Sequence, residues 1–362
     1  MTVSVLHLIT GLGTGGAEGL LVRLAVGLQA RGIPQHVVSL GDDRDSYAEV
    51  LQAHDIGVTA LGVNSVASAP GGLIKLVGII HRFSPRVIQG WMYHGNIFAL
   101  IAHKLALPTG RRAVFWNLRA SNMDAKRYGQ IVRWSARLSR WPDVIIANSE
   151  SGAAFHKSCG FKARRMVIID NGIDSETFRP DMAARREVRQ ELGVPLDVPV
   201  IIHPARVDPM KDHESFLKAI AKVPAVTALA VGSGTERLEA PKNVKALGLR
   251  RDMARLYAAA DIVVSSSAFG EGFSNAIAEG MSAGLVPIVT DVGDARRIVA
   301  DTGRVVPPSD PCALAAAIAQ ECASPEDLVA KGLRARARIV DYFSVGKFVE
   351  AFARLYESVR KA

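Results

Sequence analysis

The segment 261–294 places two apolar runs on either side of a glycine-containing loop and a helix-forming stretch. The runs DIVVSSS and LVPIVTD are rich in β-branched residues, which is typical of strands buried in a parallel sheet. Gly272 frees the backbone of the loop, Ser274 or Asn275 can cap a helix, and residues 276–281 favour helix. The segment therefore predicts a βαβ unit. Its helix N-terminus faces the carboxyl edge of the sheet, where open α/β folds bind ligands and where phosphate is attracted.

Two carboxylates, Glu271 and Glu279, bracket the loop and the start of this helix. Eight residues of helix rise about 12 Å, whereas carboxylate pairs that hydrolyse glycosides lie roughly 5 to 9.5 Å apart. The spacing suits one elongated ligand, with a sugar hydroxyl at one end, a ribose at the other and a diphosphate over the helix N-terminus. That describes a nucleotide sugar. A surface helix with two solvated glutamates is the alternative, and the spacing alone does not decide between them.

The alternation of strand and helix runs through all 362 residues. A chain of this length accommodates two domains of ordinary size. Helices long enough to cross between strands predict parallel sheets. We therefore expect an α/β fold of two Rossmann-like parallel-sheet domains, at 1–168 and 169–345, that face one another across a central cleft.

Composition limits the cellular context. No run approaches the ~20 apolar residues of a membrane span, and the first ten residues read as a strand and not as a signal peptide. Three scattered cysteines offer neither a disulfide framework nor the spacing of a metal site. These features predict a cytoplasmic protein.

The net charge of +9 is concentrated in the first half of the chain. Residues 104–140 hold nine Lys or Arg and one acid, Asp124. A local basic surface indicates an anionic partner such as phospholipid head groups, a lipid diphosphate or nucleic acid, or else a merely solvated face. Within it, an apolar stripe falls at helical spacing on one face: Ile131, Trp134, Leu138 and Trp141. Another face is marked by Arg133, Arg137 and Arg140. The pattern fits a helix on an anionic membrane, and it fits an ordinary domain helix equally well.

The first glycine loop matches a dinucleotide fingerprint. The residues Gly11 to Gly16 read G-x-G-x-x-G after a strand and before a helix, which is the pattern of an NAD(P)-dependent oxidoreductase. The acid that would bind ribose should close the second strand, where Asp42 and Asp43 look more like turn residues. Two alternatives remain: the loop lets the helix start approach an anion, or it is a tight turn without a ligand.

Five segments together carry a family resemblance. They are GGAE at 15–18, NGID at 171–174, PARVDPMKDHESFLKAI at 204–220, EGFSNAIAE at 271–279 and the final FVEAFARLYESVRKA. The chain resembles the retaining, nucleotide-sugar-dependent glycosyltransferases of family 4, which have the GT-B fold. The resemblance covers nearly the whole chain. It implies that a C-terminal helix at about 346–362 packs back on the N-terminal domain.

The resemblance also implies a donor site. Arg206 and Lys211 would hold the diphosphate and stabilise the charge of the leaving group, as a guanidinium and an ammonium do at a metal-free site. Glu271 would bind the hydroxyls of the donor sugar, and Glu279 those of the ribose. The remaining expected donor contacts are Gly15, Gly16, Leu247, Gly248, Gly272, Phe273, Ser274 and Asn275.

The chain departs from the family pattern in one place. Many members carry a His-Gly pair after a strand that here ends in Asn117-Leu118-Arg119. The role of that histidine falls to Asn117, to Arg119 or to His94, or it is missing. His94 lies in MYHGN, which is expected as a loop between the strand PRVIQGW and the helix IFALIAHKLA. We count His94, with Arg206, Lys211 and Glu271, among the candidate catalytic residues.

The family's chemistry implies front-face transfer without a cofactor or a metal ion. The expected donor is a UDP-sugar, and a GDP-sugar is the second choice. The expected acceptor is a saccharide or a polyprenyl-diphosphate-linked saccharide in polysaccharide biosynthesis, met at the inner face of the cell membrane. The competing interpretations are the oxidoreductase and a non-catalytic nucleotide-binding module. No nucleic-acid recognition motif is visible, so nucleic acid is not an expected partner.

Overall fold

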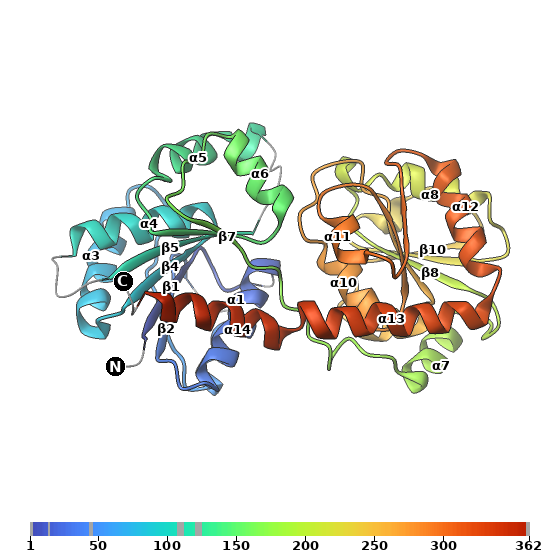
Figure 1. The fold of residues 1–362 in the computed structure, drawn as a ribbon, viewed down its shortest axis with the longest axis horizontal. Coiled ribbons are helices and arrows are strands. Elements are labelled where there is room, and N and C mark those ends of the chain that lie inside the picture. The colour runs from blue at the N-terminus through green and yellow to red at the C-terminus, as the bar shows by residue number, and fades with distance from the viewer. Residues whose placement is uncertain (1–2, 14, 43–45, 107–111, 120–124, 360–362) are drawn as a thin grey trace. The chain divides into compact units, whose positions relative to one another are not determined.

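The computed structural model describes the chain apart from residues 1–2, 14, 43–45, 107–111, 120–124 and 360–362 (Figure 1). The chain divides into two compact units. The N-terminal unit contains residues 1–172 and 345–362, and the C-terminal unit contains residues 173–344. The division after Gly172 falls shortly after the boundary expected between residues 168 and 169.

In the described part of the N-terminal unit, seven parallel strands form one sheet in the order β3-β2-β1-β4-β5-β6-β7. The strands are β1 Val5–Ile9, β2 Gln35–Ser39, β3 Gly57–Ala60, β4 Val87–Trp91, β5 Ala113–Leu118, β6 Val144–Ala147 and β7 Met166–Ile168. Strands β1, β4, β5 and β6 are buried along their whole length, which agrees with their continuous apolar sequences.

Helices cover both faces of this sheet (Figure 1). One layer contains α1 Gly16–Gln29, α2 Ser46–Ala53 and α14 Val345–Ser358, which share a single hydrophobic core. The opposite layer contains α3 Ala69–Phe83, α4 Met92–Leu105 and α5 Ala125–Leu138, beside α6 Glu150–Ser158. The strand order explains the two layers. Because β1 to β3 run in one direction across the sheet and β4 to β7 in the other, right-handed crossovers place their helices on opposite faces.

The C-terminal helix α14 belongs to the N-terminal unit, as the resemblance implied. Phe348, Phe352 and Tyr356 recur at a spacing of four residues and are buried in the core shared with α1. The hydroxyl of Tyr356 donates a hydrogen bond to the buried Gln89 on β4 at 2.7 Å. Both apolar and polar contacts therefore hold α14 on the N-terminal unit.

The C-terminal unit, whose backbone is described throughout, has six parallel strands in the order β10-β9-β8-β11-β12-β13. The strands are β8 Val200–Pro204, β9 Thr227–Val231, β10 Val244–Gly248, β11 Ile262–Ser265, β12 Val286–Thr290 and β13 Arg304–Val306. The helices are α7 Met182–Glu191, η1 Pro209–Lys211, α8 His213–Ala221, η2 Thr235–Arg237, α9 Met253–Ala259, α10 Asn275–Ser282, α11 Ala295–Val299, α12 Pro311–Cys322 and α13 Pro325–Phe343.

Each sheet has one point at which its strand order reverses. The point lies between β1 and β4 in the N-terminal unit, and between β8 and β11 in the C-terminal unit. Open α/β sheets bind ligands outside the carboxyl ends of the strands at such a point. The predicted fold class, two Rossmann-like parallel-sheet domains, is thus confirmed.

One local expectation was wrong. The MYHGN segment is not a loop, because α4 already begins at Met92 and includes His94 in its first turn. The early start depends on Gly95, where an added Cβ would lie 2.5 Å from the backbone oxygen of Leu8. The first turn of α4 therefore packs directly against the end of β1. A glycine that permits close packing of this kind resembles a loop glycine in the sequence.

Gly280 sets how closely α10 packs on the sheet, and a substitution there tests it. An added Cβ would lie 2.7–2.8 Å from the Val263 side chain on β11. We predict that Gly280→Ala destabilises the protein by about 1–3 kcal/mol through overpacking. Gly78→Ala on α3, where no atom lies within 4 Å of the added Cβ, should stabilise it by about 0.4–1 kcal/mol. Urea unfolding of both variants measures the two effects, and equal changes would contradict the packing argument.

Candidate functional site

The loop after β8 carries two of the predicted site residues, Arg206 and Lys211, and is shaped by two aspartates. Oδ1 of Asp208 accepts a hydrogen bond from the backbone N–H of Met210 at 2.9 Å, which starts the short helix η1. Asp212, in a left-handed conformation with φ 44°, then caps α8. The Met210 N–H bond is the main cause that lowers the pKa of Asp208, and Arg206 adds to it. The loop thus has a defined shape that presents Lys211.

Two buried residues, Ser266 and His203, hold this loop in place. Oγ of Ser266 lies 2.8 Å from the backbone oxygen of Lys211 and 3.0 Å from Nε2 of His203. His203 is buried and stacked on Phe216, with ring centroids 4.4 Å apart. The backbone N–H of Ala268 also donates to the Met210 carbonyl at 2.9 Å. The loops after β8 and β11 are therefore joined beside the point where the strand order reverses.

The central contact of the site is the ion pair between Lys211 and Glu271. Their side chains are only 19% and 12% exposed. The hydroxyl of Ser267 donates to the same carboxylate at 2.6 Å. The structure thus brings together a cation from the β8 loop and an anion from the β11 loop, two of the residues that the resemblance places at the donor site.

The backbone next to Glu271 is held by a close approach. Gly293 has φ 63°, and a Cβ at that position would lie 2.3 Å from the backbone oxygen of Glu271. The hydroxyl of Thr290, at the end of β12, donates to the Ser267 carbonyl at 2.6 Å. The loop after β12 therefore packs against the backbone that carries the Glu271 carboxylate. A larger residue at position 293 would displace that backbone.

The start of α10 lies beside these charges. Ser274 is the N-cap residue of α10, but its side chain makes no capping hydrogen bond. Two small hollows open at this helix end, and both are lined by Ser265, Ser274 and Ile277. One also contacts Lys211 and the end of β8, and the other contacts Glu271 and Gly272. A helix N-terminus next to a lysine is an arrangement that attracts phosphate.

Other predicted donor contacts lie outside these two hollows. The Arg206 side chain is 62% exposed and binds Asp208 at 2.9 Å. Glu279, in the second turn of α10, accepts a hydrogen bond from Tyr257 at 3.4 Å. Gly248 ends β10 and donates its N–H to Thr235 at 3.0 Å, with Leu247 before it on the strand. The Phe273 side chain is buried against Phe343, so only its backbone is available to a ligand.

The glycine loop of the N-terminal unit begins α1, with Gly15 as the N-cap and Gly16 as the first helical residue. Asp42, a candidate for the ribose acid of an oxidoreductase, accepts a hydrogen bond from Asn64 at 2.6 Å. Asp43 lies outside the described residues.

Asn117 and Arg119 lie where many family members have the His-Gly pair. They contact each other, and Arg119 also contacts residues 169–171 near the end of the N-terminal unit. The buried Asn117 accepts a hydrogen bond from Nε of Arg119 at 2.7 Å. Nη1 of Arg119 donates to the Ile169 carbonyl at 3.0 Å and to Asn171 at 2.8 Å. Burial lowers the pKa of this guanidinium. His94 is exposed on α4. A sugar or acceptor contact by any of the three stays a prediction.

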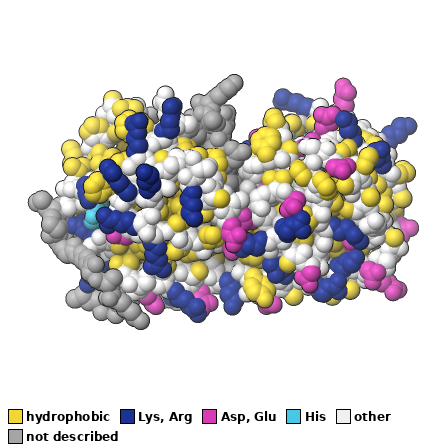
Figure 2. Space-filling view, turned by 45° about the horizontal axis from the view of Figure 1, so that its top comes forward, with side chains coloured by type: hydrophobic (Ala, Val, Ile, Leu, Met, Phe, Trp, Pro, Cys, Tyr) yellow, Lys and Arg dark blue, Asp and Glu magenta, His cyan; other side chains and the backbone are white. Residues whose placement is uncertain are grey.

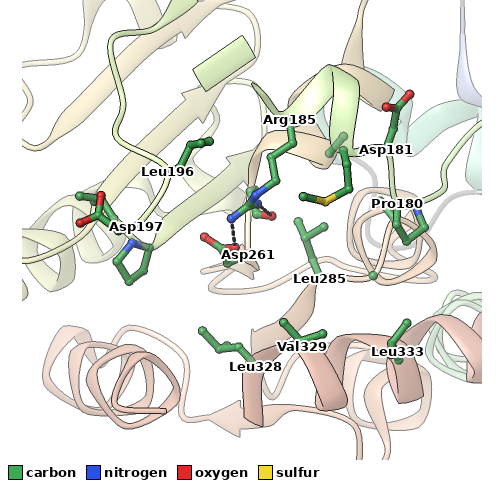
Figure 3. A pocket seen from close by; sticks show the side chains of 17 residues that line it. Pro180, Asp181, Arg185, Leu196, Asp197, Asp261, Leu285, Leu328, Val329 and Leu333 are labelled. Carbon is green, nitrogen blue, oxygen red and sulfur yellow. Dashed lines mark hydrogen bonds and ion pairs between the residues drawn. The ribbon is translucent and has the colours of Figure 1, made fainter. Parts of the chain in front are cut away.

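A further hollow of about 440 Å³ lies at the opposite edge of the C-terminal sheet (Figure 3). Arg185 and the buried Arg189 both bind Asp261 there, at 2.7 and 2.8 Å, and Leu328 and Leu333 of α13 lie across from them. None of the predicted site residues lines it. Because ligands of parallel sheets bind at the carboxyl ends of the strands, we assign the site to the region of Lys211 and Glu271. Within the described ranges, no group of three His, Cys, Asp or Glu side chains is placed to hold a metal ion.

Comparisons with protein families cover most of the chain. Residues 14–177 match the model for "Glycosyltransferase Family 4", and residues 198–323 match the model for "Glycosyl transferases group 1". The chain belongs to glycosyltransferase family 4. The two matches of this family 4 member fall on its two units, and the second includes Lys211 and Glu271.

Curated relatives match this family 4 member over a shorter stretch. The D-inositol 3-phosphate glycosyltransferase of Xylanimonas cellulosilytica is 29% identical over 196 residues, which is 48% of this chain and 47% of the relative. The enzyme of the same name from Mycobacterium tuberculosis is 29% identical over 183 residues, 45% of this chain and 38% of the relative. The match spans less than half the length of these relatives.

Solved structures match over nearly the whole chain. HepE of Anabaena in complex with UDP has a TM-score of 0.83 and 24% identity, with coverage of 99% of this chain and 100% of HepE. A glycosyltransferase of Rickettsia africae has a TM-score of 0.82 and 19% identity, with 99% of both chains covered. At these identities the likeness shows the fold, which is GT-B.

The buried histidines beneath the loop make the site sensitive to acid. Burial lowers the pKa of His203 well below its ordinary value, and burial also lowers the pKa of His213. A depressed histidine pKa contributes stability that is present above the unfolded value of about 6.5 and is lost as the pH falls below it. We predict that the protection of residues 205–215 against hydrogen exchange, measured relative to the intrinsic exchange rate at each pH, falls from about pH 6.5 downward.

In the His203→Asn variant the side chain at this position cannot titrate. The protection of residues 205–215 against hydrogen exchange should therefore depend less on pH. His54→Asn, at an exposed position on the N-terminal unit, is the matched control and should keep the dependence of the parent protein. An unchanged profile in the His203 variant would count against this origin of the effect.

Proposed function

We propose that this protein is a retaining glycosyltransferase that moves a hexose from a UDP-sugar to a saccharide or lipid-linked saccharide, in polysaccharide biosynthesis. The observation that carries the proposal is the pairing of Lys211 with Glu271 beside the N-terminus of α10. Family membership and the GT-B fold agree with it. A GDP-sugar is the second choice of donor.

The diphosphate is proposed to take the place of Glu271 at the Lys211 ammonium. The Lys211 ammonium is paired with this carboxylate in the structure, so the donor's diphosphate would compete with Glu271 for the same cation. A diphosphate is a stronger partner because it accepts charge-assisted hydrogen bonds from the ammonium and from the helix N-terminus together. Glu271 then accepts hydrogen bonds from the sugar hydroxyls, with Ser267 still holding it. The exposed Arg206 turns from Asp208 to the phosphates.

Transfer then depends on positioning and on stabilising the leaving group. The bond between the anomeric carbon and the diphosphate oxygen breaks, and the bond to the acceptor oxygen forms on the same face of the sugar. The acceptor's proton passes to an oxygen of the departing diphosphate. Lys211 and Arg206 stabilise the charge on that group, so the reaction requires neither a metal ion nor a strong base from the protein.

The choice of donor and acceptor rests on similar proteins. HepE has been solved with UDP, with UDP and glucose, and with UDP-glucose, which favours uridine. WaaG, with a TM-score of 0.67, is described as a glycosyltransferase involved in lipopolysaccharide biosynthesis. Together with the basic surface of the N-terminal unit, this favours a polyprenyl-diphosphate-linked saccharide as acceptor. The hydrogen bond of Asp42 with Asn64 gives no support to an oxidoreductase.

Nucleotide binding tests the donor site. We predict a thermal shift with UDP, a smaller one with GDP, and none with ADP or NAD. Lys211→Gln should weaken UDP binding roughly 10- to 100-fold, because it removes a charge-assisted hydrogen bond. Glu271→Gln should leave UDP affinity unchanged or higher, because it removes the competing carboxylate, and should weaken UDP-hexose binding about tenfold. Lys218→Gln, exposed on α8, is the control. Stabilisation by NAD alone would overturn the transferase proposal.

The stereochemistry and metal requirement are tested on the product. With the preferred UDP-hexose and saccharide acceptors, NMR should show the anomeric configuration of the donor retained in the product. A chelator such as EDTA should leave the rate unchanged, since Lys211 and Arg206 supply the positive charge. Inversion would contradict the retaining mechanism, and loss of activity that added Mg²⁺ or Mn²⁺ restores would contradict metal independence.

A further inference from the structure

One face of the N-terminal unit carries no acidic residue on its three main helices. The sequence has no Asp or Glu between Asp55 and Asp124, while this stretch contains seven Lys or Arg. The helices α3, α4 and α5 form one layer over the sheet, and none of them contains a carboxylate. We call the surface of these three helices the acid-free face.

The opposite layer of the same sheet shows that this is not a property of the whole unit. Its helices all carry acids: Glu18 on α1, Glu49 on α2, and Glu350 and Glu357 on α14. The helices of the acid-free face thus carry only positive charges, whereas those of the opposite layer carry charges of both signs. In Figure 2, basic side chains lie among apolar ones over the upper part of the N-terminal unit, and acidic side chains are more frequent on the C-terminal unit.

The acid-free face also contains an open apolar groove. It has a volume of about 410 Å³ and is lined by Pro70, Leu73, Ile74, Val77 and Leu105. Leu76 and Ile80 are buried on the side of α3 that faces the sheet, and the partly buried Leu73 and Val77 pack against the same core. The groove is therefore the open margin of the apolar side of α3, where Ile74 adds apolar surface beyond the core and the end of α4 closes it. Ile74 is 74% exposed and Leu105 57% exposed, so the groove is open to solvent.

Aromatic and basic side chains continue this surface onto α5 and the short segment after it, which contains Arg140, Trp141 and the exposed Asp143. The Lys104 ammonium, next to Leu105 in the chain, lies 4.9 Å from the ring centroid of Trp141, and the Arg137 guanidinium lies 5.1 Å from that of Trp134. Val132 is buried in the core, and Ile131 and Leu138 are partly buried against it. Trp134 is 57% exposed and Trp141 is 43% exposed. The apolar stripe read from the sequence is thus divided between the core and the surface.

We propose that the acid-free face docks on an anionic phospholipid bilayer, with an acyl chain in the α3–α4 groove. No helix in the described ranges is long and apolar enough to cross a membrane. Tryptophans with neighbouring arginines are suited to the level of lipid head groups, and basic residues are attracted to an anionic surface. A nucleic acid would use the positive charge but gives no reason for an open aliphatic groove. The proposal deepens the proposed function by naming where a lipid-linked acceptor is met, and its binding test is independent of transfer.

Vesicle flotation of the full-length protein tests the docking. Binding is expected to phosphatidylcholine vesicles that contain phosphatidylglycerol, and to be much weaker without it. Each arginine near an anionic surface contributes about fivefold to binding, so Arg137→Gln with Arg140→Gln should reduce binding roughly 25-fold. Ile74→Ser should reduce it roughly tenfold through the lost apolar contact. The controls lie on the other face: Arg31→Gln after α1 and Val50→Ser on α2, both exposed.

Fluorescence quenching tests which residues meet the lipid. Of the four tryptophans, Trp91 and Trp116 are fully buried. Brominated acyl chains should therefore quench the emission of Trp134 and Trp141, and Trp134→Phe with Trp141→Phe should abolish the quenching. A UDP thermal shift in every variant shows that the C-terminal unit is intact. It also separates a failed docking face from a failed donor site.

Three results would overturn the proposal. The first is the absence of flotation with anionic vesicles while the UDP shift is retained. The second is an equal loss of binding in the control variants and in the Ile74 variant. The third is salt-dependent binding to any DNA duplex that is tighter than binding to the vesicles, which would assign the face to nucleic acid.

Discussion

The ion pair of Lys211 with Glu271 depends on the reversal of strand order between β8 and β11. Adjacent strands whose following helices lie on opposite faces leave their loops splayed apart at the carboxyl edge. A site can form there only if the two loops are held at a fixed distance. Ser266 does this by bonding the β8 loop from the β11 side. The two charges then lie in contact at the position where we propose that the donor's diphosphate binds.

The sequence predicted the large features because they depend on patterns repeated along the chain. Buried apolar runs alternating with helices are enough to indicate two parallel sheets. The supports of the site could not be predicted in this way. Ser266 and His203 act through a contact between residues 63 positions apart, and neither shows a pattern of its own. A run of three serines at the end of a buried strand was the available signal, since hydroxyls there need partners.

Residues that depart from a pattern were harder to interpret. Gly95 was expected in a loop, yet it permits the close packing of α4 on β1. Arg119 was expected to contact a ligand, and the structure gives three of its hydrogen bonds to Asn117, Ile169 and Asn171. Its guanidinium also lies 5.3 Å from the ring of Phe348 on α14. These contacts give Arg119 a structural role that the sequence did not indicate, while its contact with a ligand stays a prediction.

The position of α14 has a consequence for synthesis of the protein on the ribosome. The C-terminal unit is one continuous segment, so its core can close as soon as that segment has emerged. The N-terminal unit is translated first, yet Phe348, Phe352 and Tyr356 complete its core. Until they arrive, the apolar surface beside α1 and Trp91 is uncovered, which is a condition that favours aggregation. The unit made first therefore cannot complete its core until the last residues of the chain have emerged.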